Sequence, residues 1–235
     1  MDPTTLIAEA RARGRGALDE ASGKALLSHY GVAVPRNRLV RGPDEVDAAV
    51  SDLRFPVVVK VVSTEILHKS DAGGVRVGLK TAAEVREAIR DMSVLPAIAA
   101  ARVDGWLIDE MAPAGQEVVV GGLRDPHFGP LIMVGLGGIF VEVLSDVAFR
   151  ICPVTRLDAE EMLDELKGAA VLKGARGREA ASRDAIVDVL LKLGGEGGLL
   201  MRHGDAIREA DINPLIVSAT AAVAVDARFI LDPQP

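Results

Sequence analysis

The chain has 235 residues, of which 49% are apolar and 26% are charged, the balance of an ordinary globular protein. Its formal net charge of −7 argues against free nucleic acid or an anionic membrane as a partner for the whole surface. The single cysteine, Cys152, excludes an internal disulfide and a multi-cysteine metal site, and it is typical of a reducing compartment.

The first half of the chain predicts helices around one strongly apolar strand. The N-terminus lacks the apolar core of a signal peptide, and residues 1–16 predict a loose arm or a frayed helix. Helices are expected at 18–30 and 43–53 from apolar spacing and from Pro43 in a first turn. The β-branched run at 55–62 predicts a buried strand, and 75–80 a second one. Thr81, with Glu84 three residues on, predicts the start of a helix over 81–92.

The second half is dominated by strands. They are expected at 106–111, 116–123, 130–135, 147–153, 206–217 and 221–230, with helices at 158–167 and 182–201. The most apolar stretch, residues 129–144, is too short to span a bilayer, so we expect a cytoplasmic protein with no membrane partner. Late strands follow one another without intervening helices, which favours an α+β or mixed α/β fold over a doubly wound sheet.

Lys60 and the loop that follows its strand predict a phosphate site. A buried strand lysine is costly without an anion, and phosphate is a common partner; the alternative is an edge-strand lysine facing water. The loop Thr64–Gly74 offers His68, which can act as an acid or base or accept a phosphoryl group. Backbone N–H groups of Gly73 and Gly74 can approach phosphate oxygens, although a hairpin turn explains the pair equally simply.

Polar residues at strand ends form a second set of candidates. Glu110 closes one apolar strand and Glu117 opens the next, so both carboxylates can face one cleft or, alternatively, simply be solvated. Arg124, in the turn that follows, is a candidate phosphate ligand.

The C-terminal strands carry a third set. Alternation places Glu209, Asp211 and Asn213 on one strand face, and Asp226 follows on the next strand. Oxygen ligands of this kind suit Mg²⁺, which keeps several waters and bridges phosphates. The alternative is a polar strand face turned to solvent.

These separate signals coincide with one family pattern. The chain resembles the ATP-grasp β subunit of ADP-forming acyl-CoA synthetases and, more distantly, the β subunit of succinyl-CoA synthetase. The resemblance extends from about residue 18 to residue 231. It rests on the stretches KALLSHYGVAVP, PVVVKVVSTEILHKSDAGGVRVGL, IDEMAPAGQEVVVGGLRDPHFGP, GLGGIFVEVLSDVAFR, EADINPLIV and AVDARFIL. It implies an ATP-grasp fold over residues 1–235, with a small lobe at 36–112, a larger lobe at 1–35 plus 113–235, and a nucleotide cleft between them.

The resemblance also implies how a nucleotide is held. Lys60 would contact the α- and β-phosphates. Glu110 and Met111 would form a hinge strand that recognises adenine through the backbone, and Glu117 would hold the ribose hydroxyls.

Metal binding and phosphoryl transfer are implied in the same way. Asn213 and Asp226 match the family's Mg²⁺ ligands, with Asp211 close by. His68 matches the family's second phosphohistidine, which would receive a phosphoryl group from a histidine of the α subunit and pass it to ADP.

The function implied is the nucleotide half of a reversible reaction, acyl-CoA + ADP + phosphate ⇌ carboxylate + CoA + ATP. The chain lacks a GxGxxG CoA-binding unit, so a CoA-binding α subunit carrying the first phosphohistidine, or a fused equivalent, would supply acyl-CoA and phosphate. Two alternatives remain open at this point. One is a non-catalytic ATP/ADP-sensing domain of an acyl-CoA synthetase-like or acetyltransferase protein; the other is a self-contained ligase that forms an acyl phosphate.

Overall fold

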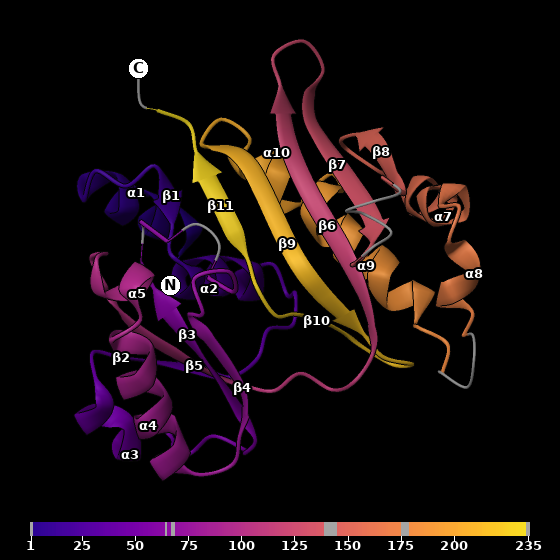
Figure 1. Cartoon of the computed structure of the whole chain (residues 1–235). Helices are drawn as coiled ribbons and strands as arrows, with labels where there is room; N and C mark the ends of the chain where they lie inside the picture. Colours follow the sequence, from indigo (N-terminus) through magenta and orange to yellow (C-terminus); the bar gives the residue numbers. More distant parts are fainter. Residues whose placement is uncertain (1, 64, 67–68, 139–144, 175–178, 234–235) are drawn as a thin grey trace. The chain divides into compact units, whose positions relative to one another are not determined.

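The structure is a computed structural model that describes residues 2–63, 65–66, 69–138, 145–174 and 179–233 (Figure 1). The chain divides into two compact units, Met1–Val34 with Pro113–Pro235, and Pro35–Ala112. Within the described ranges, no helix is both long enough and apolar enough to cross a membrane.

The first unit, Met1–Val34 with Pro113–Pro235, is built on an antiparallel sheet. Its strands run in the order β1-β11-β9-β6-β7-β8, and β10 also pairs with β9 (Figure 1). Their bounds are β1 Ala17–Leu18, β6 Gln116–Asp125, β7 Gly129–Leu136, β8 Val147–Ile151, β9 Ile207–Val217, β10 Ala222–Ala224 and β11 Arg228–Leu231. Strand neighbours distant in sequence, such as β6 and β9, therefore bring together residues that the sequence separates by about ninety positions.

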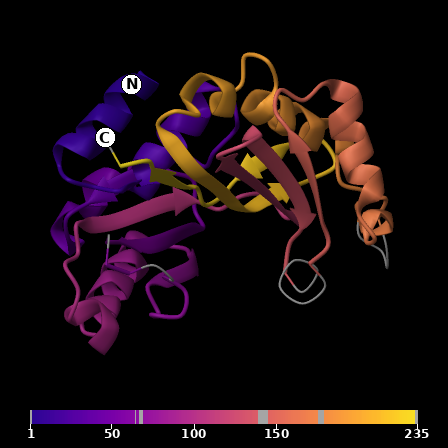
Figure 2. The ribbon, with the colours of Figure 1, turned by 90° about the horizontal axis from the view of Figure 1, so that it is seen from above.

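Helices pack on one face of this sheet (Figure 2). They are α1 Pro3–Ala12, α2 Glu20–His29, α7 Arg156–Glu165, α8 Ala169–Leu172, α9 Arg183–Gly194 and α10 Leu199–His203. Alternating strand residues such as Val118, Val120, Ile132 and Val134 are buried against them, because successive side chains of a strand point to opposite faces. The opposite face carries Glu209, Asp211 and Asn213, because they alternate along β9 with the buried Ala210 and Ile212.

Of the two alternatives for residues 1–16, the helix is confirmed over Pro3–Ala12 and the loose arm is wrong, because α1 is a regular helix whose N-cap, Asp2, accepts a hydrogen bond from the Thr5 N–H. One helix prediction for this unit needs correction. The helix expected over 182–201 is divided into α9 and α10, since Gly195 and Gly198 end one helix and begin the next. A side chain at either glycine would strike a backbone carbonyl, of Leu191 or Leu193 respectively.

The second unit, Pro35–Ala112, has a four-stranded antiparallel sheet in the order β2-β5-β3-β4. The strands are β2 Asn37–Val40, β3 Val57–Val62, β4 Val75–Leu79 and β5 Gly105–Glu110; the helices are a 3₁₀ turn Pro43–Glu45, α3 Val46–Ala49, α4 Ala82–Ser93 and α5 Pro96–Ala99. The core between sheet and helices is mostly aliphatic, with Val57, Val59 and Ile108 fully buried.

The predictions for this unit are mixed. The Thr81 hydroxyl accepts the Glu84 N–H at 3.2 Å, which confirms the start of α4. The helix expected over 43–53 is shorter than predicted, since a 3₁₀ turn and four α-helical residues replace it. The α+β or mixed α/β class is confirmed, with antiparallel pairing in both sheets.

Candidate functional site

Lys60 lies on an interior strand and not on a sheet edge. Strand β3 pairs with β5 on one side and β4 on the other, so the water-facing alternative is excluded. The Lys60 side chain is 6% exposed, and its Nζ lies 3.0 Å from Oδ2 of Asp109. The two residues are diagonal neighbours across β3 and β5, because Val58 is opposite Asp109 and Lys60 opposite Leu107. The sheet therefore holds a buried ammonium group in one fixed orientation.

The loop that leads into β4 forms a tight turn over its described part, residues 69–74. The N–H groups of Gly73 and Gly74 donate to the carbonyls of Ser70 at 3.0 Å and Lys69 at 2.7 Å. Gly73 has a φ of +70°, and a side chain at Gly74 would strike Val61. Both glycines therefore have a structural reason to be glycine, and both N–H groups are used inside the loop. His68 lies outside the described residues.

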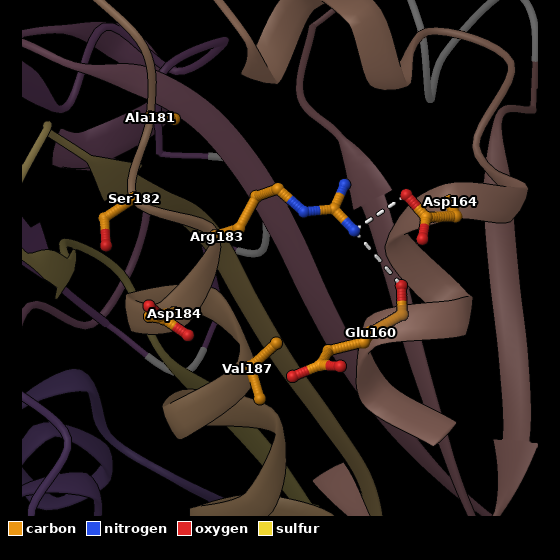
Figure 3. A pocket seen from close by; sticks show the side chains of 7 residues that line it. All are labelled: Glu160, Asp164, Ala181, Ser182, Arg183, Asp184 and Val187. Carbon is orange, nitrogen blue, oxygen red and sulfur yellow. Dashed lines mark hydrogen bonds and ion pairs between the residues drawn. The ribbon is translucent and has the colours of Figure 1, made fainter. Parts of the chain in front are cut away.

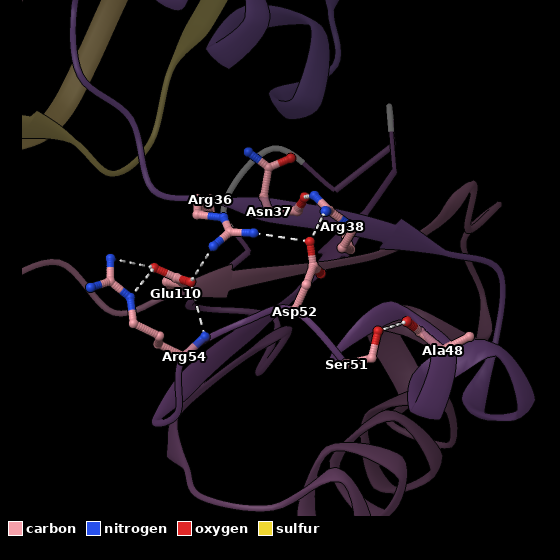
Figure 4. Close-up of polar contacts among 8 residues, drawn as sticks. All are labelled: Arg36, Asn37, Arg38, Ala48, Ser51, Asp52, Arg54 and Glu110. Carbon is pink, nitrogen blue, oxygen red and sulfur yellow. Dashed lines mark hydrogen bonds and ion pairs between the residues drawn. The ribbon is translucent and has the colours of Figure 1, made fainter.

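The Glu110 carboxylate is enclosed by arginines at the end of β5 (Figure 4). It accepts hydrogen bonds from the Arg54 N–H at 2.9 Å and from the Arg54 guanidinium at 3.3 and 3.4 Å, and Arg36 lies 3.9 Å away. Burial alone would raise the pKa of this carboxyl, yet the hydrogen bonds from Arg54 and the charges of Arg54 and Arg36 hold its pKa below the usual value. The side chain thus ties the start of β3 to the end of β5.

Two backbone N–H groups of the expected hinge, those of Glu110 and Met111, already form hydrogen bonds within the unit. The Glu110 N–H donates to the Arg36 carbonyl at 2.9 Å, and the Met111 N–H donates to the Pro56 carbonyl at 3.3 Å. Recognition of adenine by these two N–H donors would need other hydrogen bonds to open first. A contact between adenine and the backbone carbonyl groups at this position does not require those two N–H hydrogen bonds to break.

Glu117 opens β6 in the other unit and presents its carboxylate to solvent. Among the described residues its side chain forms no hydrogen bond or ion pair, in contrast to Glu110. Its backbone is held on both sides: it is opposite Ile216 of β9, and its carbonyl accepts the Gly137 N–H at 2.9 Å. A fixed strand end with an unused carboxylate is suited to hydroxyl groups of a ligand.

The C-terminal polar residues converge on one face of the same sheet. Ala224 is opposite Leu215, and Arg228 is opposite Asp211, so residue 226 falls opposite residue 213 between these two pairings. The Val225 N–H donates to the Pro214 carbonyl at 3.0 Å, which fixes that register. Asn213 and Asp226 are therefore cross-strand neighbours, next to Asp211.

The electrostatics of this row suit a cation. Burial raises the pKa of the Asp211 carboxyl, and the charges of Asp226 and Glu209 raise it further, while Arg228 opposes them. No three His, Cys, Asp or Glu side chains in the described ranges are close enough to form a complete metal cage. Mg²⁺ commonly needs only one or two carboxylates, with waters and substrate phosphates as the other ligands, so the oxygen donors present fit it.

Arg124 does not belong to this face. Leu123 is opposite Glu209, so alternation turns Arg124 towards the helix-covered side of the sheet. Its guanidinium forms ion pairs with Asp232 at 2.9 Å and Asp205 at 3.5 Å. It also lies seven residues along β6 from Glu117, about 24 Å at strand rise. The structure does not support Arg124 as a phosphate ligand at this site.

A groove of about 490 Å³ lies between α7 and α9 and contains none of the predicted site residues (Figure 3). It is lined by Glu160, Asp164, Ala181, Ser182, Arg183, Asp184 and Val187. The Arg183 guanidinium donates to the Asp164 carboxylate at 2.8 Å and to the Glu160 carbonyl at 3.3 Å across it. These contacts tie two helices together, which is a packing role.

Sequence reasoning missed two residues that shape the candidate site. Asp109 is the buried partner of Lys60. The available signal in the sequence was a charged residue inside the apolar run WLIDE. Arg54 holds Glu110, but a surface arginine before a strand gives no such signal. The candidates are distributed over both units: Lys60, Gly73, Gly74, Glu110 and Met111 in one, and Glu117, Asn213 and Asp226 in the other.

Comparisons with known proteins identify the family of the chain. Residues 9–231 match the family model described as the ATP-grasp domain. The chain is 42% identical over 228 residues to the acetate–CoA ligase (ADP-forming) I subunit beta of Pyrococcus furiosus, and the match covers 96% of both chains.

Solved structures give the same result. One is the dinucleotide-forming acetyl-coenzyme A synthetase 1 of Candidatus Korarchaeum cryptofilum in complex with coenzyme A, Ca-AMPCP and HgCl⁺. It has a TM-score of 0.92 and 40% identity, and covers 98% of this chain and 100% of that one. A second structure of that synthetase holds coenzyme A and Mg-AMPPCP, with its phosphohistidine segment pointing towards the nucleotide binding site. It has a TM-score of 0.84 and 39% identity, and covers 98% of this chain and 100% of that one.

Proposed function

The chain belongs to the ATP-grasp β subunits of ADP-forming acetate–CoA ligases, and we propose that Lys60, Glu117, Asn213 and Asp226 form its nucleotide site. Subunits of this family use ATP or ADP with Mg²⁺ and act with a partner subunit. The observation that carries the proposal is the register that sets Asn213 opposite Asp226 beside Asp211. Within the proposal, Asn213 and Asp226 hold Mg²⁺.

Each residue has a defined task in this proposal. Lys60 neutralises charge on the α- and β-phosphates, and its ion pair with Asp109 holds the ammonium group in position. Glu117 accepts hydrogen bonds from the ribose hydroxyls. The backbone carbonyl groups of Glu110, at the end of β5, and of Met111, directly after it, accept from the adenine amino group. When bound, Mg²⁺ would neutralise negative charge on the phosphates.

The chemistry proposed for His68 is transfer of a phosphoryl group to ADP. The imidazole nitrogen–phosphorus bond breaks and its electron pair stays on nitrogen, a new bond forms between that phosphorus and a β-phosphate oxygen of ADP, and the ring takes up one proton and leaves as neutral imidazole. The partner proposed is a CoA-binding α subunit that carries the first phosphohistidine and supplies acyl-CoA and phosphate. Phosphoryl transfer of this kind relies on positioning and charge neutralisation, which the residues above provide.

A reconstitution assay tests the proposal. The chain is mixed with its partner subunit, acetyl-CoA, ADP, Mg²⁺ and radioactive phosphate, and ATP formation and acid-labile labelling of this chain are measured. We expect His68→Ala to abolish both, and His127→Ala, at an exposed turn residue, to leave both unchanged.

Normal ATP formation and labelling in His68→Ala would refute the phosphoryl-carrier role. Nucleotide binding without labelling of the unsubstituted chain, in the presence of a working partner, would instead indicate an ATP/ADP-sensing domain.

A further inference from the structure

Gly137 follows β7 directly and lies opposite Glu117. Val118 is paired with Leu136, so the next pair along the ladder is Glu117 with Gly137. The Gly137 N–H donates to the Glu117 carbonyl at 2.9 Å, although β7 itself ends at Leu136. Gly137 is thus the immediate neighbour of the proposed ribose ligand on the β7 side.

The approach between the two residues leaves no room for a side chain. A Cβ built on Gly137 would lie 2.7 Å from the Glu117 Cβ and 3.1 Å from its carbonyl carbon and oxygen. Directly opposite Cβ atoms of an ordinary antiparallel pair are about 4.5–5.5 Å apart. Gly137 has no positive φ, unlike Gly138 at +63°, so space and not backbone conformation requires glycine there.

On its other side Glu117 is paired with Ile216 of β9, and two residues before it a Cβ on Gly115 would lie 2.5 Å from the Val217 carbonyl oxygen. The start of β6 is therefore held between β9 and the residue after β7. A side chain at position 137 has to be accommodated by moving Glu117.

We propose that Gly137 is a positioning residue that sets the place of the Glu117 carboxylate for a ribose diol. Its missing side chain lets the backbone of β7 approach Glu117 closely, and its N–H holds the Glu117 carbonyl. The inference rests on the proposed function, because it takes Glu117 as the ribose ligand. A displacement of Glu117 by a few tenths of an ångström weakens two charge-assisted hydrogen bonds to the ribose without touching phosphate, metal or adenine contacts.

The test compares ADP with 2′,3′-dideoxy-ADP in the reconstituted enzyme. The ratio of kcat/KM for ADP to kcat/KM for 2′,3′-dideoxy-ADP does not depend on how much enzyme is folded. A loss of folded enzyme alone therefore leaves this ratio unchanged. For Gly137→Ala we expect this ratio to fall about tenfold, through KM for ADP, since hydrogen bonds to a carboxylate are lost. Glu117→Ala should lower the ratio at least as far.

A matched control comes from the other end of the same ladder. Gly129 is opposite Asp125, has a φ of +77° and has open space where a Cβ would be. Asparagine tolerates that conformation, so Gly129→Asn should keep the unsubstituted ratio.

Two results would overturn the inference while leaving the ribose role of Glu117 intact. One is an unchanged ratio in Gly137→Ala together with a collapsed ratio in Glu117→Ala. The other is a Gly137→Ala chain that does not fold, because we expect Glu117 to absorb the contact. An unchanged ratio in Glu117→Ala would instead refute the ribose role itself.

Discussion

Carboxylates in two regions of this chain have pKa values shifted in opposite directions. In the unit Pro35–Ala112, each acidic residue near the candidate site has a cationic neighbour: Asp109 has Lys60, and Glu110 has Arg54 and Arg36. In the other unit, burial raises the pKa of the Asp211 carboxyl, and the charges of Asp226 and Glu209 raise it further, while Arg228 opposes them. The two regions therefore differ in what surrounds a carboxylate: arginines lower the pKa of Glu110, whereas burial and like charges raise the pKa of Asp211.

The largest effect is expected from breaking the buried pair in the first region. Lys60→Met removes the ammonium group from beside Asp109, which is almost fully buried. We expect a loss of about 3–5 kcal/mol in the free energy of unfolding, measured by denaturant titration.

The control for that substitution is Lys80→Met at an exposed position, expected to change the stability by no more than about 0.5 kcal/mol. A Lys60→Met chain as stable as the unsubstituted one would show that the pair is not what fixes this region.

A smaller effect is expected from weakening the arginine enclosure of Glu110. Glu110→Gln removes the charge from a set of hydrogen bonds with Arg54, at a cost of about 1–2 kcal/mol. Because the pKa of Glu110 is lowered in the folded chain, its contribution is present above the unfolded pKa and is lost as pH falls through the folded pKa.

The stability difference between the two proteins should therefore be full at pH 7 and shrink in the acid range below about pH 4, the ordinary range of a glutamate. Thermal melts from pH 7 to pH 3 measure it. A difference that stays constant over this range would contradict the proposed role of the Glu110 charge.

The smallest effect, with the opposite sign, is expected in the acidic row. Asp211→Asn removes one of three like charges, so the nucleotide-free chain should become more stable at pH 7, by on the order of 0.5 kcal/mol. The pKa of Asp211 is raised in the folded state, so the penalty in the unsubstituted chain is present above that pKa and disappears as pH falls through it.

The stabilisation by Asp211→Asn should likewise diminish when Mg²⁺ and ADP are added, because the cation relieves the same repulsion. Melting curves with and without Mg-ADP provide the measurement. A destabilised variant at pH 7 would mean that Asp211 is compensated like the acidic residues of the first region.

Sequence alone determined the features that depend on neighbours within a few residues. The β-branched run predicted a buried strand around Lys60, and Thr81 with Glu84 predicted the start of α4. Strand alternation placed Glu209, Asp211 and Asn213 on one face, and the resemblance indicated the ATP-grasp family. Each of these is fixed by local periodicity or by a motif that can be read along the chain.

Tertiary structure decided everything that depends on strand register. Pairing of β9 with β10 and β11 sets Asp226 opposite Asn213, and β6 pairing turns Arg124 to the helix-covered face. The bulge between Val118 and Val120 shifts that register by one residue, which no local pattern shows. Side-chain placement across a sheet follows from long-range pairing, and so the partner of Lys60 and the close approach of Gly137 to Glu117 emerge only from the folded chain.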